Sequence, residues 1–357
     1  MKTRTSIIPF TPGKGGITEY HIMIRVTDPS LDYPSQLASV LQAGAEAAEG
    51  KVVRFRRFFL SDAANQSPLL AQRLDALPPV PTSIVGQAPL DGTRIALWMY
   101  CTDPAESPYK HRWDASLVSP GEDSRAQMDG IFRELERRLA REGLSVARDT
   151  IRTWIFSRDV DTRYAGVVKG RKDYFETIGL TEATHYIAST GIEGNAPDPH
   201  HIVEMDAYSI GGLQDGQIRY LYASDHLSRT SQYGVTFERG TAVTYGDRRH
   251  VFISGTASID AQGQVVHPGD VAAQTGRMLE NVSALLAEAG AGLRDIVVAV
   301  VYLRDPADYA CVKRCIEASC PALNAIYVHA PVCRPAWLVE MECIALTPDG
   351  DKAFPAF

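Results

Sequence analysis

Apolar and polar residues alternate along two similar segments of the chain, residues 202–210 and residues 338–346. Both segments contain the tripeptide Val-Glu-Met, whose glutamates are Glu204 and Glu340. Alternation with a period of two residues predicts a β-strand that buries one face. Two such similar strands indicate a duplicated unit, and duplication would place a functional cleft between two related halves.

The similarity extends upstream of both strands. Residues 127–141 and 274–288 each place apolar side chains on one helical stripe, and a glycine and a buried apolar run follow each of them. These runs cover residues 151–156 and 296–303, and the charged residues that flank them keep the same spacing in both copies. The order of elements predicts an α+β fold of two tandem modules, each a mixed sheet with helices on one face.

The length of 357 residues accommodates two domains, which we expect at residues 1–220 and 221–357. A hydrophobic content of 45% and a charged content of 22% are typical of a globular protein. The net charge of −7 disfavours nucleic acid as a partner, because binding to phosphates needs a basic face. The apolar runs are too short for a membrane span or an export signal, so we expect no membrane association and a cytoplasmic location.

Neither a metal ion nor a cofactor is expected from the motifs. Cys311, Cys315 and Cys320 fall on a helical stretch without neighbouring ligands, so we interpret them as reduced thiols. The sequence also contains no glycine-rich dinucleotide or phosphate loop, no HExxH and no GxSxG. The chemistry must therefore come from dispersed residues.

The C-terminal half resembles the YjgF/Rid family in the strings VFISGTASID, LRDIVVAVVYLRDPADY and LVEMECIAL. This resemblance implies a chorismate-mutase-like α+β module, ligand sites at the interfaces of a trimer, and imine-deaminase activity. Deaminase members carry an arginine shortly after the proline of the last helix. Leu323 stands at that position here, which disfavours plain deaminase activity.

The whole chain resembles the chorismatase family in the strings FLSDAANQ, VGQAPLDG and THYIASTGIEG and in the segment from Cys333 to Glu340. The resemblance implies two YjgF/Rid-like modules and the removal of the enolpyruvyl group of chorismate as pyruvate. It favours 3-hydroxybenzoate as the main second product, with 4-hydroxybenzoate as a further one. The alternatives are a hydrolytic chorismatase that yields a dihydroxycyclohexadiene carboxylate, and a Rid-like imine deaminase or ligand-binding module. Because one chain holds both modules, we expect a monomer with trimer-like internal packing.

Cleavage of an enol ether without a metal requires a proton donor, and a buried carboxylic acid can serve at neutral pH. In the resemblance, Glu340 falls on the family's catalytic glutamate. The period of two places Glu342 on the same face of the strand, so the sequence alone does not rank these two carboxylates. The two carboxylates of chorismate call for arginines. The expected substrate-binding residues are Arg158, Tyr164, Arg171, Tyr208, Arg239 and Arg334.

Product choice is expected to depend on Cys333 and Gly246. In the resemblance, the aromatising branch has this pair of cysteine and glycine, whereas the hydrolytic branch has alanine at both positions. Glycine leaves space beside the substrate ring, and a thiol can hold or relay a proton while the ring aromatises. The alternative interpretation of Cys333 is a small buried core residue.

Overall fold

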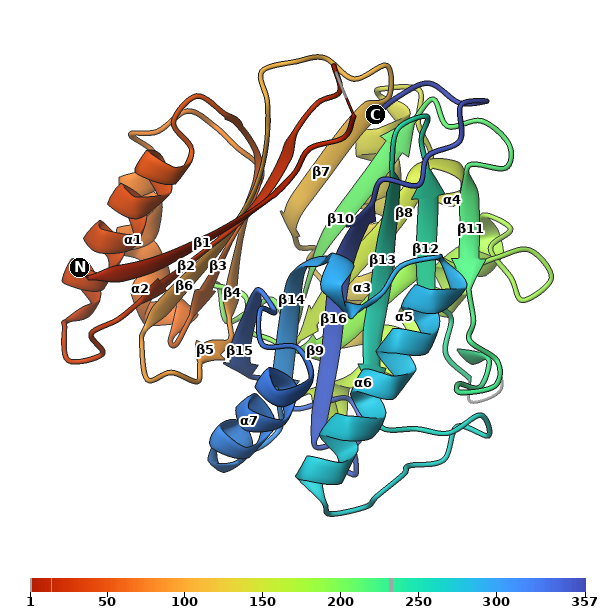
Figure 1. Cartoon of the computed structure of the whole chain (residues 1–357). Helices are drawn as coiled ribbons and strands as arrows, with labels where there is room; N and C mark the ends of the chain where they lie inside the picture. Colours follow the sequence, from red (N-terminus) through yellow and green to blue (C-terminus); the bar gives the residue numbers. More distant parts are fainter. Residues whose placement is uncertain (1, 14, 231–233) are drawn as a thin grey trace.

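The computed structural model describes residues 2–13, 15–230 and 234–357. Within these residues the strands form three β-sheets, and helices cover the outer faces of the sheets (Figure 1). No helix of the described residues is long and apolar enough to cross a bilayer. The α+β class predicted from the sequence is confirmed.

The first sheet is built by the N-terminal part of the chain. Its strand order is β1 (Thr3–Phe10), β2 (Glu19–Val26), β6 (Ile95–Thr102), β3 (Val52–Leu60) and β4 (Thr82–Gly86). Helices α1 (Tyr33–Ala47) and α2 (Ala63–Leu74) pack against this sheet. Leu37 and Val40 of α1 bury their side chains against apolar residues of β2 and β6.

The second sheet follows in sequence. Its strand order is β7 (Lys110–Leu117), β10 (Val203–Gly211), β8 (Thr150–Ser157) and β9 (Ala188–Glu193). The helices of this unit are α3 (Ser124–Ala140), α4 (Val146–Asp149) and α5 (Val160–Thr177). The stripe predicted on α3 is buried, since Ile131, Leu135 and Leu139 belong to the core of this unit.

The third sheet contains the C-terminal strands. Its order is β11 (Ile218–Leu221), β12 (Gly240–Thr244), β13 (Arg249–Ala257), β16 (Val339–Thr347), β14 (Ile296–Leu303), β15 (Ala325–His329) and β5 (Ala88–Pro89). Its helices are α6 (Val271–Glu288), η2 (Leu293–Asp295), η3 (Pro306–Asp308) and α7 (Tyr309–Ser319). The short strand β5 comes from the N-terminal part, so the third sheet is completed by a distant segment.

The two units predicted from the repeat share one topology. In the second sheet β8 runs parallel to β9 and antiparallel to β10, and in the third sheet β14 has the same relation to β15 and β16. An aspartate caps the first long helix of each unit, Asp123 in α3 and Asp270 in α6. Each carboxylate accepts a hydrogen bond from the backbone three residues on, which satisfies a free amide at the helix start.

The first sheet is a further copy that the repeat did not reveal. Strand β3 runs parallel to β4 and antiparallel to β6, and Asp32 caps α1. The pairing of Leu60 with Ile95 places Ala96 of β6 where the other units have Glu204 and Glu340. Without that glutamate, β6 lacks the string that identified the repeat.

The expected boundary at residue 220 falls inside β11, and the range 1–220 contains two of the three sheets. The inner faces of the three sheets meet in a common aromatic core. In this core Trp98 of the first sheet lies 6.3 Å from Trp154 of the second, measured between ring centroids. Tyr208 of the second sheet lies 5.6 Å from Phe252 of the third. These contacts fix the interfaces between the units.

Candidate active site

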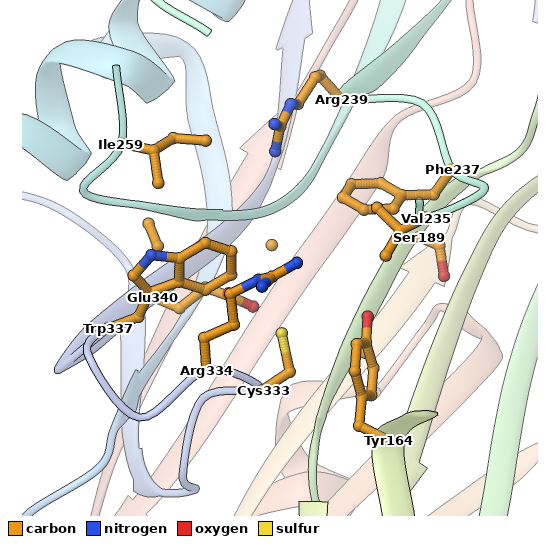
Figure 2. Close-up of a pocket in the computed structure, with 13 residues that line it drawn as sticks. Tyr164, Ser189, Val235, Phe237, Arg239, Ile259, Cys333, Arg334, Trp337 and Glu340 are labelled. Atoms are coloured by element: carbon orange, nitrogen blue, oxygen red, sulfur yellow. The ribbon is translucent and has the colours of Figure 1, made fainter. Parts of the chain in front are cut away.

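A pocket lies between the second and third units. The second unit contributes residues of α5 and β9, and the third contributes β13, β16 and the segments that precede β12 and β16. Figure 2 shows side chains from both units directed into one space. The lining residues are Tyr164, Ser189, Gly191, Val235, Phe237, Arg239, Gly255, Ala257, Ile259, Cys333, Arg334, Trp337 and Glu340.

Glu340 provides the acidic group of this pocket. It is the second residue of β16, pairs with Ala257 on one side and Tyr302 on the other, and is 4% exposed. Burial, reinforced by the negative charge of Glu342, raises the pKa of Glu340 to about 8, and Arg239 opposes the shift. A carboxyl group in this environment holds its proton at neutral pH and can donate it.

Glu342 has a different environment although it shares the inner face of β16. Its Oε2 atom lies 2.8 Å from Nη2 of Arg152 on β8, and it also accepts a hydrogen bond from the Thr190 hydroxyl. The Glu342 carboxylate is therefore neutralised within the interface between the units. The structure thus distinguishes two carboxylates that the sequence left equivalent, since Glu340 alone of the two lines the pocket.

Cys333 and Tyr164 meet from opposite sides of the interface. Burial raises the pKa of the Cys333 thiol to about 12, with a further contribution from Glu340, while a hydrogen bond to Tyr164 opposes the shift. Gly191 of β9 makes room for the phenol, because a Cβ atom there would lie 2.7 Å from Cε2 of Tyr164. The thiol is therefore protonated at neutral pH and close to the acid.

Two arginines extend into the pocket. Arg239, just before β12, donates from Nε and Nη2 to the carbonyl oxygen of Ser228 at 3.2 and 3.1 Å. The Arg334 guanidinium lies 5.5 Å from the ring centroid of Trp337. Figure 2 shows Arg239 entering from the side opposite to Cys333 and Arg334. The pocket thus combines a protonated acid with two fixed cations, an arrangement suited to a small anion.

Five of the nine predicted site residues therefore line one pocket, namely Glu340, Cys333, Tyr164, Arg239 and Arg334. Arg171 lies in the layer behind. Its guanidinium donates to the hydroxyls of Thr236 and Ser189 at 3.1 and 3.4 Å and lies against Phe237. Arg171 supports the wall of the pocket, which differs from the expected direct contact with substrate.

The structure corrects the expected placement of Arg158 and Tyr208. The Arg158 side chain donates to Asn195 Oδ1 at 3.3 Å and to the carbonyl of Pro199, outside the pocket. The Tyr208 hydroxyl lies 2.7 Å from Nδ1 of His111 in the central aromatic core. Polar and alternating patterns like those around these two residues occur both at functional sites and in buried hydrogen-bond networks. The sequence pattern therefore does not distinguish the two cases.

The expected placement of Gly246 is also corrected. Gly246 lies in the turn after β12, where its amide donates to the carbonyl of Pro355 at 2.7 Å. The six residues that separate Gly246 from Arg239 span roughly 20 Å of extended chain, so the turn lies at the far end of the strand. Gly246 fits closely against the C-terminal segment and does not line the pocket.

Several lining residues were not identified from the sequence. Phe237 and Trp337 form apolar walls, and Ser189 and Gly255 bring the backbones of β9 and β13 close to the acid. The strings THYIASTGIEG and VFISGTASID contain Ser189 and Gly255, so the signal was present as part of the resemblance. Only the pairing of the two units shows which residues of these strings face the pocket.

Comparisons with known proteins were made for sequence and for fold. The chain matches the family model described as Endoribonuclease L-PSP over residues 240–347. A RutC family protein of Pyrococcus abyssi (strain GE5 / Orsay) is 36% identical over 97 residues, which cover 27% of this chain and 76% of that protein. The 3-hydroxybenzoate synthase of Streptomyces hygroscopicus is 28% identical over 219 residues, which cover 55% of this chain and 63% of the synthase.

The matches span between 60% and 76% of the lengths of three curated relatives. Among solved structures, a chorismatase crystal structure superposes with a TM-score of 0.65 at 18% identity, covering 95% of this chain and 100% of that one. The resemblance predicted from the sequence is confirmed for the fold and for the C-terminal module. Through its C-terminal unit the chain belongs to the RutC family, and over 95% of its length it has the fold of a chorismatase.

Proposed function

We propose that this protein cleaves chorismate to a hydroxybenzoate, mainly 3-hydroxybenzoate, and pyruvate in the pocket around Glu340. The observation that carries the proposal is the buried Glu340 carboxyl, whose pKa is raised to about 8, in one pocket with Arg239 and Arg334. Chorismate is a dianion with an acid-labile enol ether. Its two carboxylates match two guanidinium groups, and its enol ether requires a proton donor.

In the proposed reaction, Glu340 transfers its proton to the vinyl methylene carbon of the enol ether. The adjacent carbon becomes an oxocarbenium centre, and the Glu340 carboxylate that forms lies within the field of Arg239. The neighbouring ring hydroxyl then attacks the ring carbon that carries the ether and gives up its proton to the Glu340 carboxylate. The bond between that carbon and the ether oxygen breaks, which releases the side chain as pyruvate and leaves an epoxide-like intermediate. Loss of a ring proton aromatises the remainder, so the two products together contain all the atoms of chorismate.

Cys333 is proposed to steer the fate of the ring. Because its pKa is raised to about 12, the side chain acts as a neutral thiol that donates or holds a proton, and not as a thiolate. Its neighbours Tyr164 and Glu340 provide partners for that proton. This role favours opening of the intermediate toward 3-hydroxybenzoate.

Incubation of the purified protein with chorismate tests this function directly. We expect chromatography to show pyruvate and 3-hydroxybenzoate in equal amounts, with 4-hydroxybenzoate as a minor product. Formation of a dihydroxycyclohexadiene carboxylate would instead identify the hydrolytic alternative. No consumption of chorismate would contradict the proposal and leave the deaminase alternative, which Leu323 disfavours because its apolar side chain packs against the core.

We also propose a cytoplasmic monomer. Three units of one topology within a single chain meet at a common core, so the contacts that other assemblies form between subunits are internal here. Light scattering should give the mass of one chain. A stable trimer would contradict this proposal.

Replacing Cys333 with alanine should change the products more than the rate. Glu340 still supplies the proton, so enol ether cleavage continues, whereas 3-hydroxybenzoate should fall and the diene diol or 4-hydroxybenzoate should rise. The measurement is the product ratio at equal conversion. Cys311→Ala, on the outer helix α7, is the matched control and should leave the ratio unchanged. An unchanged ratio in Cys333→Ala would show that this residue only packs.

Replacing Gly246 with alanine should change stability and leave the product ratio alone. The added Cβ atom would overlap the carbonyl oxygen of Phe354 and lie 3.0 Å from the amide nitrogen of Ala356. We expect the free energy of unfolding to fall by about 1–3 kcal/mol, the usual cost of overpacking. Thermal unfolding and product analysis on the same sample check this. A changed product ratio at unchanged stability would contradict the structural role of Gly246.

A further inference from the structure

The Thr190 hydroxyl joins the second and third units directly behind the pocket. Thr190 lies on β9 between the lining residues Ser189 and Gly191 and is 1% exposed. Its Oγ1 atom accepts a hydrogen bond from Nη2 of Arg152 and donates one to Oε2 of Glu342. It also accepts a hydrogen bond of 2.9 Å from the amide of Gly255. One donor and two acceptor positions use the full capacity of a hydroxyl group.

Gly255 lies directly against the acid. A Cβ atom at this position would overlap Oε1 of Glu340 and would lie 2.8 Å from Cδ of Glu340 and 3.1 Å from Cγ2 of Thr190. The register of β13 against β16 shifts between Ile253 and Thr256, which marks a bulge around Gly255. The bare backbone of Gly255 therefore forms the floor on which the Glu340 carboxyl rests.

These contacts form a continuous path from an ion pair to the acid. Arg152 and Glu342 are a buried pair, Thr190 is bound to both, and Thr190 holds the Gly255 amide. A second hydrogen bond joins the same two strands, because the Ser189 amide donates to the Ser254 hydroxyl at 2.9 Å. The path crosses the interface, so the second unit sets the position of an acid carried by the third.

We propose that Thr190 is a positioning residue for Glu340, and that it acts by holding the Gly255 backbone under the carboxyl group. This inference deepens the proposed function and rests on it for its kinetic test. A displacement of a reacting group by about 1 Å can lower the reaction rate on the order of 100-fold. The Gly255 backbone beneath the acid therefore matters for catalysis even if it does not touch the substrate.

The kinetic test compares Thr190→Val with Thr190→Ser. Valine has nearly the shape of threonine but forms none of the three hydrogen bonds, whereas serine retains the hydroxyl. We expect Thr190→Val to lower kcat by about 10- to 100-fold with KM changed by less than about threefold. Thr190→Ser should remain within about threefold of the parent protein. Unchanged kcat in Thr190→Val, or a loss of kcat that serine does not restore, would overturn the proposal.

A second test requires no substrate and separates this inference from the proposed function. Gly255→Ala should lower the melting temperature by about 1–4 °C, because the new methyl group displaces the Glu340 carboxyl. The same substitution in a Glu340→Ala background should cost less than half as much, since the overlapping oxygen is gone. Gly276→Ala on α6, where a Cβ atom meets nothing within 4 Å, is the matched control and should not destabilise.

An equal cost of Gly255→Ala in the two backgrounds would overturn the inference even if the protein cleaves chorismate. Conversely, a protein that does not consume chorismate but shows the coupled stability change would refute the proposed function and retain the positioning of Glu340 by Gly255. The two failures are therefore distinguishable.

Discussion

Glu340→Gln should lower the turnover of chorismate by about 10²- to 10⁴-fold, the usual contribution of a positioned general acid. Glutamine keeps the shape of the side chain and can still occupy the floor formed by Gly255, but it has no proton to transfer. KM should change little, because the arginines proposed to bind the substrate are untouched. Glu317→Gln, on the exposed side of α7, is the matched control and should retain full activity. Full activity in Glu340→Gln would assign the proton donor to another group.

The same acid predicts the pH dependence of kcat. The proposed role requires Glu340 to be protonated, and burial together with Glu342 raises its pKa to about 8. The rate should therefore be constant below that pH and fall as pH rises through it. Arg239 and Arg152 oppose the shift, and Cys333 faces the same carboxyl. The pH at which the rate falls therefore reports the combined effect of these groups on Glu340. Glu342→Gln removes the negative neighbour and should move the fall in rate to lower pH.

Arg152→Met should lower the free energy of unfolding by about 3–5 kcal/mol, because it removes the guanidinium 2.8 Å from the buried Glu342 carboxylate and leaves only that of Arg57 at 3.8 Å. Arg152 and Glu342 are 1% and 5% exposed in their side chains, and the guanidinium also lies 4.8 Å from the ring centroid of Trp154. Methionine retains much of the packing volume, so the loss of stability reports the removal of the positive charge. Denaturant unfolding measures it.

Arg125→Met provides the control for this prediction. Arg125 pairs with Asp173 on the surface, where its side chain is 51% exposed, and loss of such a pair costs at most about 1 kcal/mol. A loss below about 1 kcal/mol at neutral pH in Arg152→Met would contradict the structural role assigned to its ion pair with Glu342.

Much of the fold could be predicted from the sequence, because the two Val-Glu-Met strands share both the two-residue alternation and an identical tripeptide. The unit that contains β6 escaped notice, since Ala96 and Trp98 stand where the other copies carry acidic residues. A periodic pattern without a shared string predicts a strand but does not identify its counterpart. The pairing register of β3 and β6 supplied that identification.

The site was predicted in part for the same reason. Cys333, Arg334 and Glu340 lie close together in sequence, so one segment brings them to the pocket. Tyr164 and Arg239 come from other segments, were expected because a dianionic substrate calls for such groups, and line the same pocket. Ranking Glu340 above Glu342 required the partner across the interface, Arg152, which no local pattern reveals.

Glu340 is proposed to protonate the vinyl carbon of chorismate, and isotope incorporation tests this step most directly. The reaction is run in deuterium oxide, and the pyruvate is trapped at once by enzymatic reduction to lactate before its methyl group exchanges. We expect one deuterium in the methyl group of every lactate formed, and almost no product from Glu340→Gln. Lactate without methyl deuterium, or labelled lactate formed equally fast by Glu340→Gln, would contradict the proposed step.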